Sequence, residues 1–306
     1  QFYINKKWIM KQQVHTCKNT KTKLASKRFY LFFSISIMTL LFSSCKKENK
    51  SPETWQFTKL VNATLDNNGY MVNIQFYQKK GNQWRIVRMS PDDYTKFNFV
   101  DDSVITPNAF ELPVDNKNAF MTNDVLLFNP ADDKVYNQGN LRWYLGDPIQ
   151  FKTFTTFETE FPDMPAAYNK ISKFSAATFS LEQAYDNNSK TSTYIFYDFP
   201  NQKYVYYGTR SGSDLIIENT LPLLCTTCGG INWKNIDAVT CTGETNESYY
   251  YFFDFDAQKM YILSRIDKNT NHPSFQFDTG MTIDFADAFK GKYGTANQNV
   301  AFDFSK

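Results

Sequence analysis

The feature that most constrains the fold is a strand–turn–strand pattern that recurs along the chain. Runs of aromatic and β-branched residues flank a turn of Pro, Asp, Asn or Gln in residues 124–137, 194–207 and 250–263. Residues 55–88 add a meander of three alternating segments, separated by turns rich in Asn and Gly. Period-two alternation broken by such residues is typical of antiparallel hairpins. Aromatic residues make up 17% of the chain, which favours strands further. We therefore predict an all-β fold made of antiparallel hairpins.

Helical signals are few and short. Ser90 followed by Pro91 has the form of a helix start, and residues 283–289 are long enough for one short helix. Residues 299–304, NVAFDF, predict a final strand, and a terminal strand often pairs back into a sheet. These segments leave the all-β prediction unchanged.

A second feature, near the N-terminus, indicates the compartment. Residues 27–48 read KRFYLFFSISIMTLLFSSCKKE, with a 14-residue apolar run from Phe29 to Phe42. The run is too short for a comfortable membrane span of about 20 residues. It has the length of the core of an export signal, and basic residues without any acidic residue precede it. The sequence therefore predicts that the chain after this run is exported from the cytoplasm.

The run is followed by Ser43-Ser44-Cys45, which resembles the lipobox of bacterial lipoproteins; the ending SSCKKE is most similar to lipoproteins of the Bacteroidetes type. Phe42 departs from the pattern, which usually has an aliphatic residue there. The resemblance implies that the Cys45 thiol carries lipid, such as palmitate, and that Cys45 becomes the new N-terminus. Lys46 in place of an aspartate implies the outer membrane, at its periplasmic face or at the cell surface. An ordinary signal peptide with an incidental cysteine is the alternative.

These features divide the chain into three parts. We expect residues 1–44 to be a lipoprotein signal peptide, residues 45–54 a lipidated tether and residues 55–306 an all-β globular domain. Met10 would begin a leader of its own, so we expect residues 1–9 to be an artefact.

The charge balance changes when the leader is set aside. The first 44 residues hold eight of the 33 lysines and arginines and no acidic residue. The remaining 25 basic and 31 acidic residues give the exported part a net charge near −6. Proteins that bind nucleic acid carry a basic patch or stripe, and no basic block follows Lys50. We therefore predict that nucleic acid is not a partner.

The hairpins have a common context that resembles a known repeat. IDAVTCTGETNESYYYFFDFDAQKMYIL, residues 236–263, is similar to a hemopexin-like repeat, in which an aliphatic-Asp-Ala start precedes an aromatic hairpin. Phe174-Ser175-Ala176-Ala177 precedes the hairpin at 194, and Asn108-Ala109-Phe110 is a fainter match before the hairpin at 124. With the hairpin near residue 72, four units are spaced by 52 to 70 residues. The resemblance implies a four-bladed hemopexin-like propeller. A β-sandwich is the alternative, because aromatic hairpins occur there too.

Three cysteines, Cys225, Cys228 and Cys241, follow Cys45 in the sequence. The spacing of Cys225 and Cys228 suits a disulfide, a redox pair or half of a zinc site. Because oxidation is the default outside the cytoplasm, we predict a structural disulfide, most simply between Cys241 and one of the pair. A zinc site would need a fourth ligand, and His272, the only histidine after the leader, lies in a polar turn. No cofactor is predicted, and zinc and haem stay open as alternatives.

Catalytic motifs are missing from the sequence. One histidine after the leader and no Gly-x-Ser-x-Gly elbow give no Ser–His arrangement, and no phosphate-binding loop is present. A glycoside hydrolase needs only two carboxylates at a suitable separation. The candidates by residue type are Asp92-Asp93, Asp101-Asp102, Asp132-Asp133 and Asp254 with Asp256. Turn and surface roles explain the same residues. The sequence favours a non-enzymatic role, with a carbohydrate-active hydrolase as the alternative.

The aromatic strands supply the predicted binding residues. Alternate residues of a strand face opposite sides, so one row of rings can build the core while the other row meets a ligand. Tyrosine suits sugar faces and protein partners. The candidates are Tyr197, Tyr206, Tyr251 and Tyr261. We therefore predict an outer-membrane lipoprotein with a ligand-binding, protein-binding or structural role at the cell envelope. Its expected partners are the lipid membrane and a glycan or envelope proteins.

Overall fold

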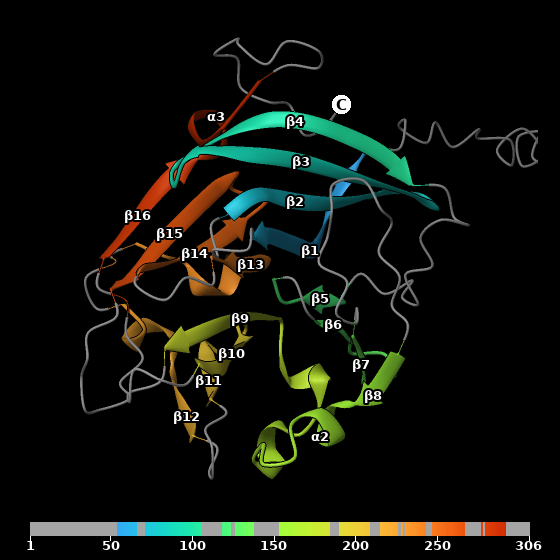
Figure 1. The fold of residues 1–306 in the computed structure, drawn as a ribbon, viewed down its shortest axis with the longest axis vertical. Helices are drawn as coiled ribbons and strands as arrows, with labels where there is room; N and C mark the ends of the chain where they lie inside the picture. The colour runs from blue at the N-terminus through green and yellow to red at the C-terminus, as the bar shows by residue number, and fades with distance from the viewer. Residues whose placement is uncertain are drawn as a thin grey trace, which may run out of the picture. The chain divides into compact units, whose positions relative to one another are not determined.

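A computed structural model shows four sheets that follow one another along the chain and around a common centre (Figure 1). It describes residues 54–65, 71–105, 118–123, 126–137, 153–183, 190–208, 215–225, 228, 230–242, 247–266, 277 and 279–291. All four sheets lie in the compact unit formed by residues 52–306. They form a four-bladed β-propeller, which confirms the all-β prediction. The β-sandwich alternative is wrong.

Each blade is made of four consecutive strands, every one antiparallel to the next. Blade 1 contains β1 (Gln56–Leu65), β2 (Met71–Lys80), β3 (Gln83–Asp93) and β4 (Lys96–Ile105). Blade 2 contains β5 (Phe120–Met121), β6 (Leu126–Asn129), β7 (Lys134–Asn137) and β8 (Thr153–Thr156). Blade 3 contains β9 (Ala176–Gln183), β10 (Lys190–Asp198), β11 (Lys203–Gly208) and β12 (Leu215–Thr220). Blade 4 contains β13 (Ala238–Cys241), β14 (Glu247–Asp254), β15 (Lys259–Ile266) and β16 (Thr279–Asp284).

Short helical turns connect the blades. Blades 2 and 3 are joined by α2 (Phe157–Glu160), η1 (Ala166–Tyr168) and η2 (Ile171–Lys173). Blades 3 and 4 are joined by η3 (Leu221–Leu223) and η4 (Trp233–Asn235). After blade 4 come α3 (Phe285–Ala288) and β17 (Phe289–Lys290). Within the described ranges, the helical residues therefore lie between blades or directly after blade 4.

The first strands of the four blades line the centre. β1 is next to β5 and β13, and β9 is next to the same two strands, so the four strands close into a ring. Side-chain bonds cross this ring. Asn123, which follows β5, accepts hydrogen bonds at Oδ1 from the backbone N–H of Phe179 (2.9 Å) and from the thiol of Cys241 (3.3 Å). These contacts tie blades 2, 3 and 4 together at their inner edges.

The hairpin between the second and third strands repeats in detail. In blades 2, 3 and 4 the last turn residue has a positive φ, near 55°, and its carbonyl accepts the N–H of the first residue after the fourth strand. The acceptor and donor residues are Asp133 and Phe157 (3.3 Å), Gln202 and Leu221 (2.8 Å), and Gln258 and Phe285 (2.8 Å). Each donor residue is buried and begins a helical turn. The predicted hairpins are thus equivalent parts of a structural repeat.

One hydrophobic core fills each gap between neighbouring blades. Blades 3 and 4 enclose the first, blades 1 and 4 the second, blades 2 and 3 the third, and blades 1 and 2 the fourth. Because each blade packs against a neighbour on both faces, its middle strands carry large apolar residues on both faces. Burial of aromatic rings contributes strongly to stability, which explains the aromatic hairpins.

The end of the described chain returns to blade 1. β17 pairs in parallel with β4, Phe289 lying opposite Phe97. The two rings are 5.5 Å apart, and Phe289 also contacts Phe76 at 5.4 Å. The segment after blade 4 therefore closes the ring of blades onto the outer strand of the first.

The structure corrects two local predictions. Ser90 and Pro91 belong to β3 rather than to a helix, and the side chain of Asp93 accepts the N–H of Thr95 in the turn that follows. The inner strand of blade 2 begins at Phe120, after Asn118 and Ala119, and the triplet Asn108-Ala109-Phe110 lies outside the described residues. The helix predicted at 283–289 is shorter, at Phe285–Ala288. The predicted strand 299–304 also lies outside the described residues.

Candidate binding surface

The four tyrosines predicted to contact a ligand are buried between blades. Tyr197 and Tyr251 have 0% of their surface exposed, Tyr206 7% and Tyr261 5%. Burial raises the pKa of the Tyr197 hydroxyl well above its usual value, and this hydroxyl bonds to Thr178 Oγ1 at 3.1 Å. These rings are core residues because the neighbouring blades cover both faces of their strands. A binding surface has to be sought among other side chains.

The cysteines pair differently from the simplest prediction. Cys225 and Cys228 form a disulfide, with their Cα atoms 5.3 Å apart, and Cys241 is a buried free thiol. A disulfide is thus confirmed, but the pairing of Cys241 with one of the two is wrong. The reason is position: Cys241 ends β13 at the propeller centre, where its thiol bonds to Asn123 and to the carbonyl oxygen of Phe179 (3.1 Å). Cys45 lies outside the described residues.

The disulfide has a close neighbour on blade 4. A Cβ atom placed on Gly280 of β16 would lie 2.2 Å from Cys228 Sγ and 2.6 Å from a methyl carbon of Leu263. Only glycine fits beneath the disulfide without a shift of its neighbours. The Cys225–Cys228 disulfide lies in the connection between blades 3 and 4. It therefore packs closely against β16, the outer strand of blade 4.

Most of the candidate carboxylates hold turns or form ion pairs. Asp254 Oδ1 accepts the N–H of Ala257 at 2.8 Å. Asp101 pairs with Arg88 at 2.8 Å, and Asp132 with Lys134 at 3.7 Å. These are the turn and surface roles that the residue types also suggest.

Asp237 differs from the other carboxyl groups. Burial is the main cause that raises its pKa, and the charges of Asp256 and Asp254 raise it further. Its Oδ2 accepts the N–H of Phe255 at 2.9 Å. A carboxyl group with a raised pKa beside two other carboxylates is the arrangement closest to acid–base chemistry among the described residues.

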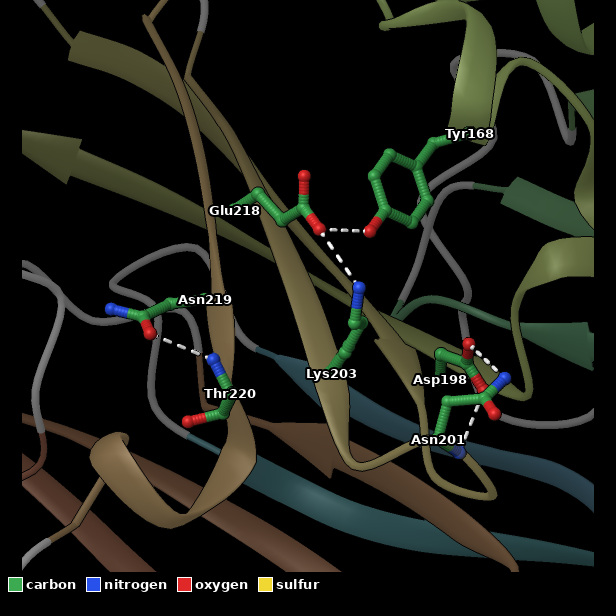
Figure 2. Close-up of polar contacts among 7 residues, drawn as sticks. All are labelled: Tyr168, Asp198, Asn201, Lys203, Glu218, Asn219 and Thr220. Carbon is green, nitrogen blue, oxygen red and sulfur yellow. Dashed lines mark hydrogen bonds and ion pairs between the residues drawn. The ribbon is translucent and has the colours of Figure 1, made fainter.

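A polar cluster links the connection after blade 2 to the outer strands of blade 3. Figure 2 shows the hydroxyl of Tyr168 and the ammonium group of Lys203 on the same oxygen of Glu218. The Lys203–Glu218 distance is 3.2 Å, and both side chains are 46% exposed. The hydrogen bond from Tyr168 is the main cause that lowers the pKa of Glu218. This cluster positions η1 against β11 and β12.

The hairpin end of blade 1 carries an unusual set of side chains, which we call the tryptophan end: Trp55, Lys79, Lys80, Trp84 and Arg85. The Lys79 ammonium lies 5.4 Å from the centre of a Trp84 ring. On the other face of the sheet, the Arg85 guanidinium lies 4.8 Å and the Lys80 ammonium 6.0 Å from a Trp55 ring. Cations at these distances are attracted to the ring face. Both indoles and both lysines are partly exposed.

Arg85 anchors the tryptophan end from below. Its side chain is buried, donates to Gln78 Oε1 at 2.9 Å and forms an ion pair with Asp102 at 3.4 Å. The pKa of Asp102 is nevertheless raised, because the desolvation of its carboxyl group outweighs the attraction of Arg85. These contacts hold the Arg85 guanidinium in place, and the Trp55 ring packs against it.

The alternating pattern of residues 55–88 does not by itself reveal this surface. The local signal is the pair of lysines directly before the β2–β3 turn with Trp84 shortly after it, and Trp55 joins them from the residue before β1. A smaller pair on blade 2 has the same form: Phe154 is 61% exposed, and the Lys134 ammonium lies 4.3 Å from its ring.

Comparison with models of known protein families and with curated proteins gave no match to this chain. Within the described ranges, no three His, Cys, Asp or Glu side chains converge as metal ligands. No helix in the same ranges has the length and hydropathy needed to cross a membrane.

Proposed function

We propose that the chain is an exported lipoprotein, anchored in the outer membrane by acyl chains on Cys45, whose propeller is a binding module at the cell envelope. The observation that carries the proposal is Ser43-Ser44-Cys45 directly after a basic start and an apolar run of export-signal length. The ending SSCKKE resembles that of Bacteroidetes-type lipoproteins. Several acyl chains on one residue would hold the domain firmly to a bilayer.

The propeller supports a binding role. Its four blades meet at their inner strands, and polar contacts there join blades 2, 3 and 4. The segments before the later hairpins resemble the start of hemopexin-like repeats. Fixed blades present loops and hairpin ends without change in the core, and binding residues often lie on loops held by such scaffolds. The partly exposed indoles and cations of the tryptophan end are the described side chains best suited to contact a ligand.

The experiment compares the full chain with Cys45→Ala in a Gram-negative host supplied with labelled palmitate. The native chain is expected to incorporate label and to sediment with outer membranes. Cys45→Ala is expected to lose the label and to stay unprocessed or detached. If Cys45→Ala retains both processing and membrane attachment, the lipoprotein proposal is wrong.

A carbohydrate-active hydrolase is the second candidate, and Asp237 is the observation that favours it. A general acid of such an enzyme needs a raised pKa next to a second carboxylate, which Asp237 has in Asp254 and Asp256. Incubation of the purified protein with envelope glycans tests this candidate. Cleavage that Asp237→Asn abolishes would support the hydrolase, and glycan binding without cleavage would support the binding module.

A further inference from the structure

We propose that the tryptophan end of blade 1 rests on the anionic headgroup surface of the membrane that holds the anchor. The inference rests on the proposed function, because it assumes that acylated Cys45 tethers the propeller to a bilayer. It goes further by naming the face of the propeller that meets the membrane and the lipid chemistry that this face recognises.

The side chains are those that suit a bilayer surface. Indole rings concentrate at the level of the headgroups because they have an apolar body and a polar N–H. Lysine keeps its ammonium group near the headgroups while its methylene stem covers apolar surface. At the tryptophan end each indole has an ammonium group 5.4 to 6.0 Å from a ring centre. Val104, opposite Arg85 on β4, adds an apolar side chain that is 55% exposed.

The charge at this end is opposite to that of the whole exported part. Lys79, Lys80 and Arg85 are cationic, and among the described residues 54–57, 78–85 and 102–105 the only acidic one is Asp102. Asp102 is almost buried and forms an ion pair with Arg85, so it does not repel an anionic surface. The two lysines therefore give a positive end to a domain whose net charge is near −6. Such a local charge selects an anionic surface over a neutral one.

The path of the chain places this end near the anchor. Trp55 immediately precedes β1 and comes ten residues after Cys45. An extended chain spans at most about 3.3–3.6 Å per residue, so the chain length limits the separation of the Cα atoms of Trp55 and Cys45 to about 35 Å. The tryptophan end is thus where the tether enters the propeller. The face that touches the membrane has to lie within reach of the tether. The tryptophan end does so, because the tether joins the propeller at Trp55.

The expected strength follows from the charges. Each lysine near an anionic bilayer strengthens binding by about fivefold, and this attraction disappears at high salt. Alone, two lysines and two indoles give weak and reversible contact. The acyl chains hold the domain close to the surface, and the contact then fixes its orientation.

The experiment uses the chain from residue 45 with Cys45→Ser, which contains the whole compact unit 52–306 and carries no lipid. Its partition is measured on vesicles of phosphatidylcholine alone and of equal parts phosphatidylcholine and phosphatidylglycerol. We expect binding only to the anionic vesicles at low salt. Lys79→Ala with Lys80→Ala should lower the partition coefficient by tenfold or more, at about fivefold for each lysine. The matched control, Lys170→Ala with Lys173→Ala in exposed positions at η2, should leave it within about twofold.

Quenching of tryptophan fluorescence by brominated lipid identifies the face that touches the bilayer. We expect strong quenching in the parent chain and loss of most of it in Trp55→Phe with Trp84→Phe. Unchanged quenching in that variant, or equal partition on neutral and anionic vesicles, overturns the proposal. Preference for an acidic polysaccharide such as polygalacturonate over anionic vesicles overturns it as well, since the surface would then recognise a glycan.

The result is separable from that of the palmitate experiment. If Cys45 is acylated and the vesicles show no selective binding, the proposed function stands and the membrane-facing surface is wrong. If the vesicles bind selectively while Cys45 carries no lipid, the anchor is wrong and the headgroup contact stands. Urea unfolding of each variant, with an unchanged midpoint, shows that lost binding does not come from lost folding.

Discussion

Cys241 and Asn123 meet at the centre of the propeller although 118 residues separate them in the chain. The thiol of Cys241 donates to Asn123 Oδ1, and the same oxygen accepts the N–H of Phe179 from the blade between them. Asn123 follows β5, Phe179 lies within β9 and Cys241 ends β13, so one amide oxygen joins three blades at their inner strands. Both Asn123 and Cys241 are almost completely buried. The centre of the propeller therefore depends on the amide oxygen of Asn123, because an apolar side chain would not accept these hydrogen bonds.

Removal of that oxygen should weaken the whole propeller. Asn123→Ala leaves the N–H of Phe179 without its acceptor at a partly buried position and removes an acceptor from the buried thiol of Cys241. We expect the free energy of unfolding to fall by about 1–2 kcal/mol in urea titrations. The control is Asn201→Ala, because Asn201 forms its hydrogen bonds with Asp198 at an exposed turn. A loss for Asn123→Ala no larger than that of the control would contradict this role.

The left-handed turn residues offer a stabilising change. Gln258 has a φ of 53° and uses its backbone carbonyl, which any residue provides, to hold Phe285. Glycine adopts this conformation without the steric cost that other residues have. Gln258→Gly should therefore raise the free energy of unfolding by about 0.5–1 kcal/mol, and Gln258→Ala should not. Thermal unfolding of the two variants measures the difference. Equal melting temperatures for both would show that the backbone there is not strained.

The cluster in Figure 2 should make stability depend on pH at both extremes. The pKa of Glu218 is lowered, so its contribution is present above the ordinary value of 4.5 and is lost as the pH falls through the folded value. The pKa of Tyr168 is raised, mainly by burial, so its contribution is present below 10 and is lost as the pH rises further.

Unfolding midpoints across the pH range test this sign. Glu218→Gln should flatten the acid branch by about 0.5 kcal/mol, a small value because the side chain is half exposed. Tyr168→Phe should flatten both branches, since it removes the phenol and the hydrogen bond to Glu218. An acid branch that is as steep in Glu218→Gln as in the native chain would rule out this carboxylate as the source.

Gly280 and the Cys225–Cys228 disulfide should be energetically coupled. Gly280→Ala places a methyl group against Cys228 Sγ, and overpacking of this kind costs about 1–3 kcal/mol. Part of that cost should disappear when Cys225→Ser and Cys228→Ala remove the disulfide, which gives a coupling energy of about 0.5–1 kcal/mol or more. Urea unfolding of the four chains measures it. Additive effects would mean that Leu263, not the disulfide, limits the space at this position.

The sequence predicts the hairpins well because their signals are local. Pro, Asp, Asn and Gln between two aromatic runs specify a turn, and the same turn recurs in blades 2, 3 and 4. The start of blade 2 is harder to predict, because the chain contains Asn-Ala-Phe twice, at 108–110 and at 118–120, and a local pattern does not distinguish identical triplets. In the structure the inner strand β5 begins at Phe120.

Whether a candidate site residue is exposed depends on residues that are far away in the sequence. The sequence alone does not show which of these lie next to it. Tyr197 and Tyr251 alternate with other residues, as residues on an exposed face of a strand would. In the structure, however, a neighbouring blade covers each face of their strands. The position of Cys241 at the propeller centre likewise follows from the closure of four blades. The tryptophan end combines residues before β1 with both sides of the β2–β3 hairpin, so its members come together only when the sheet forms.

The lipid anchor is decided by the mass of the N-terminal peptide of the protein purified from outer membranes. We expect a peptide that begins at Cys45 and carries a diacylglyceryl group and an amide-linked acyl chain. A mature chain that begins at another residue, or an unmodified Cys45, would contradict the proposed lipid anchor and the outer-membrane location that depends on it.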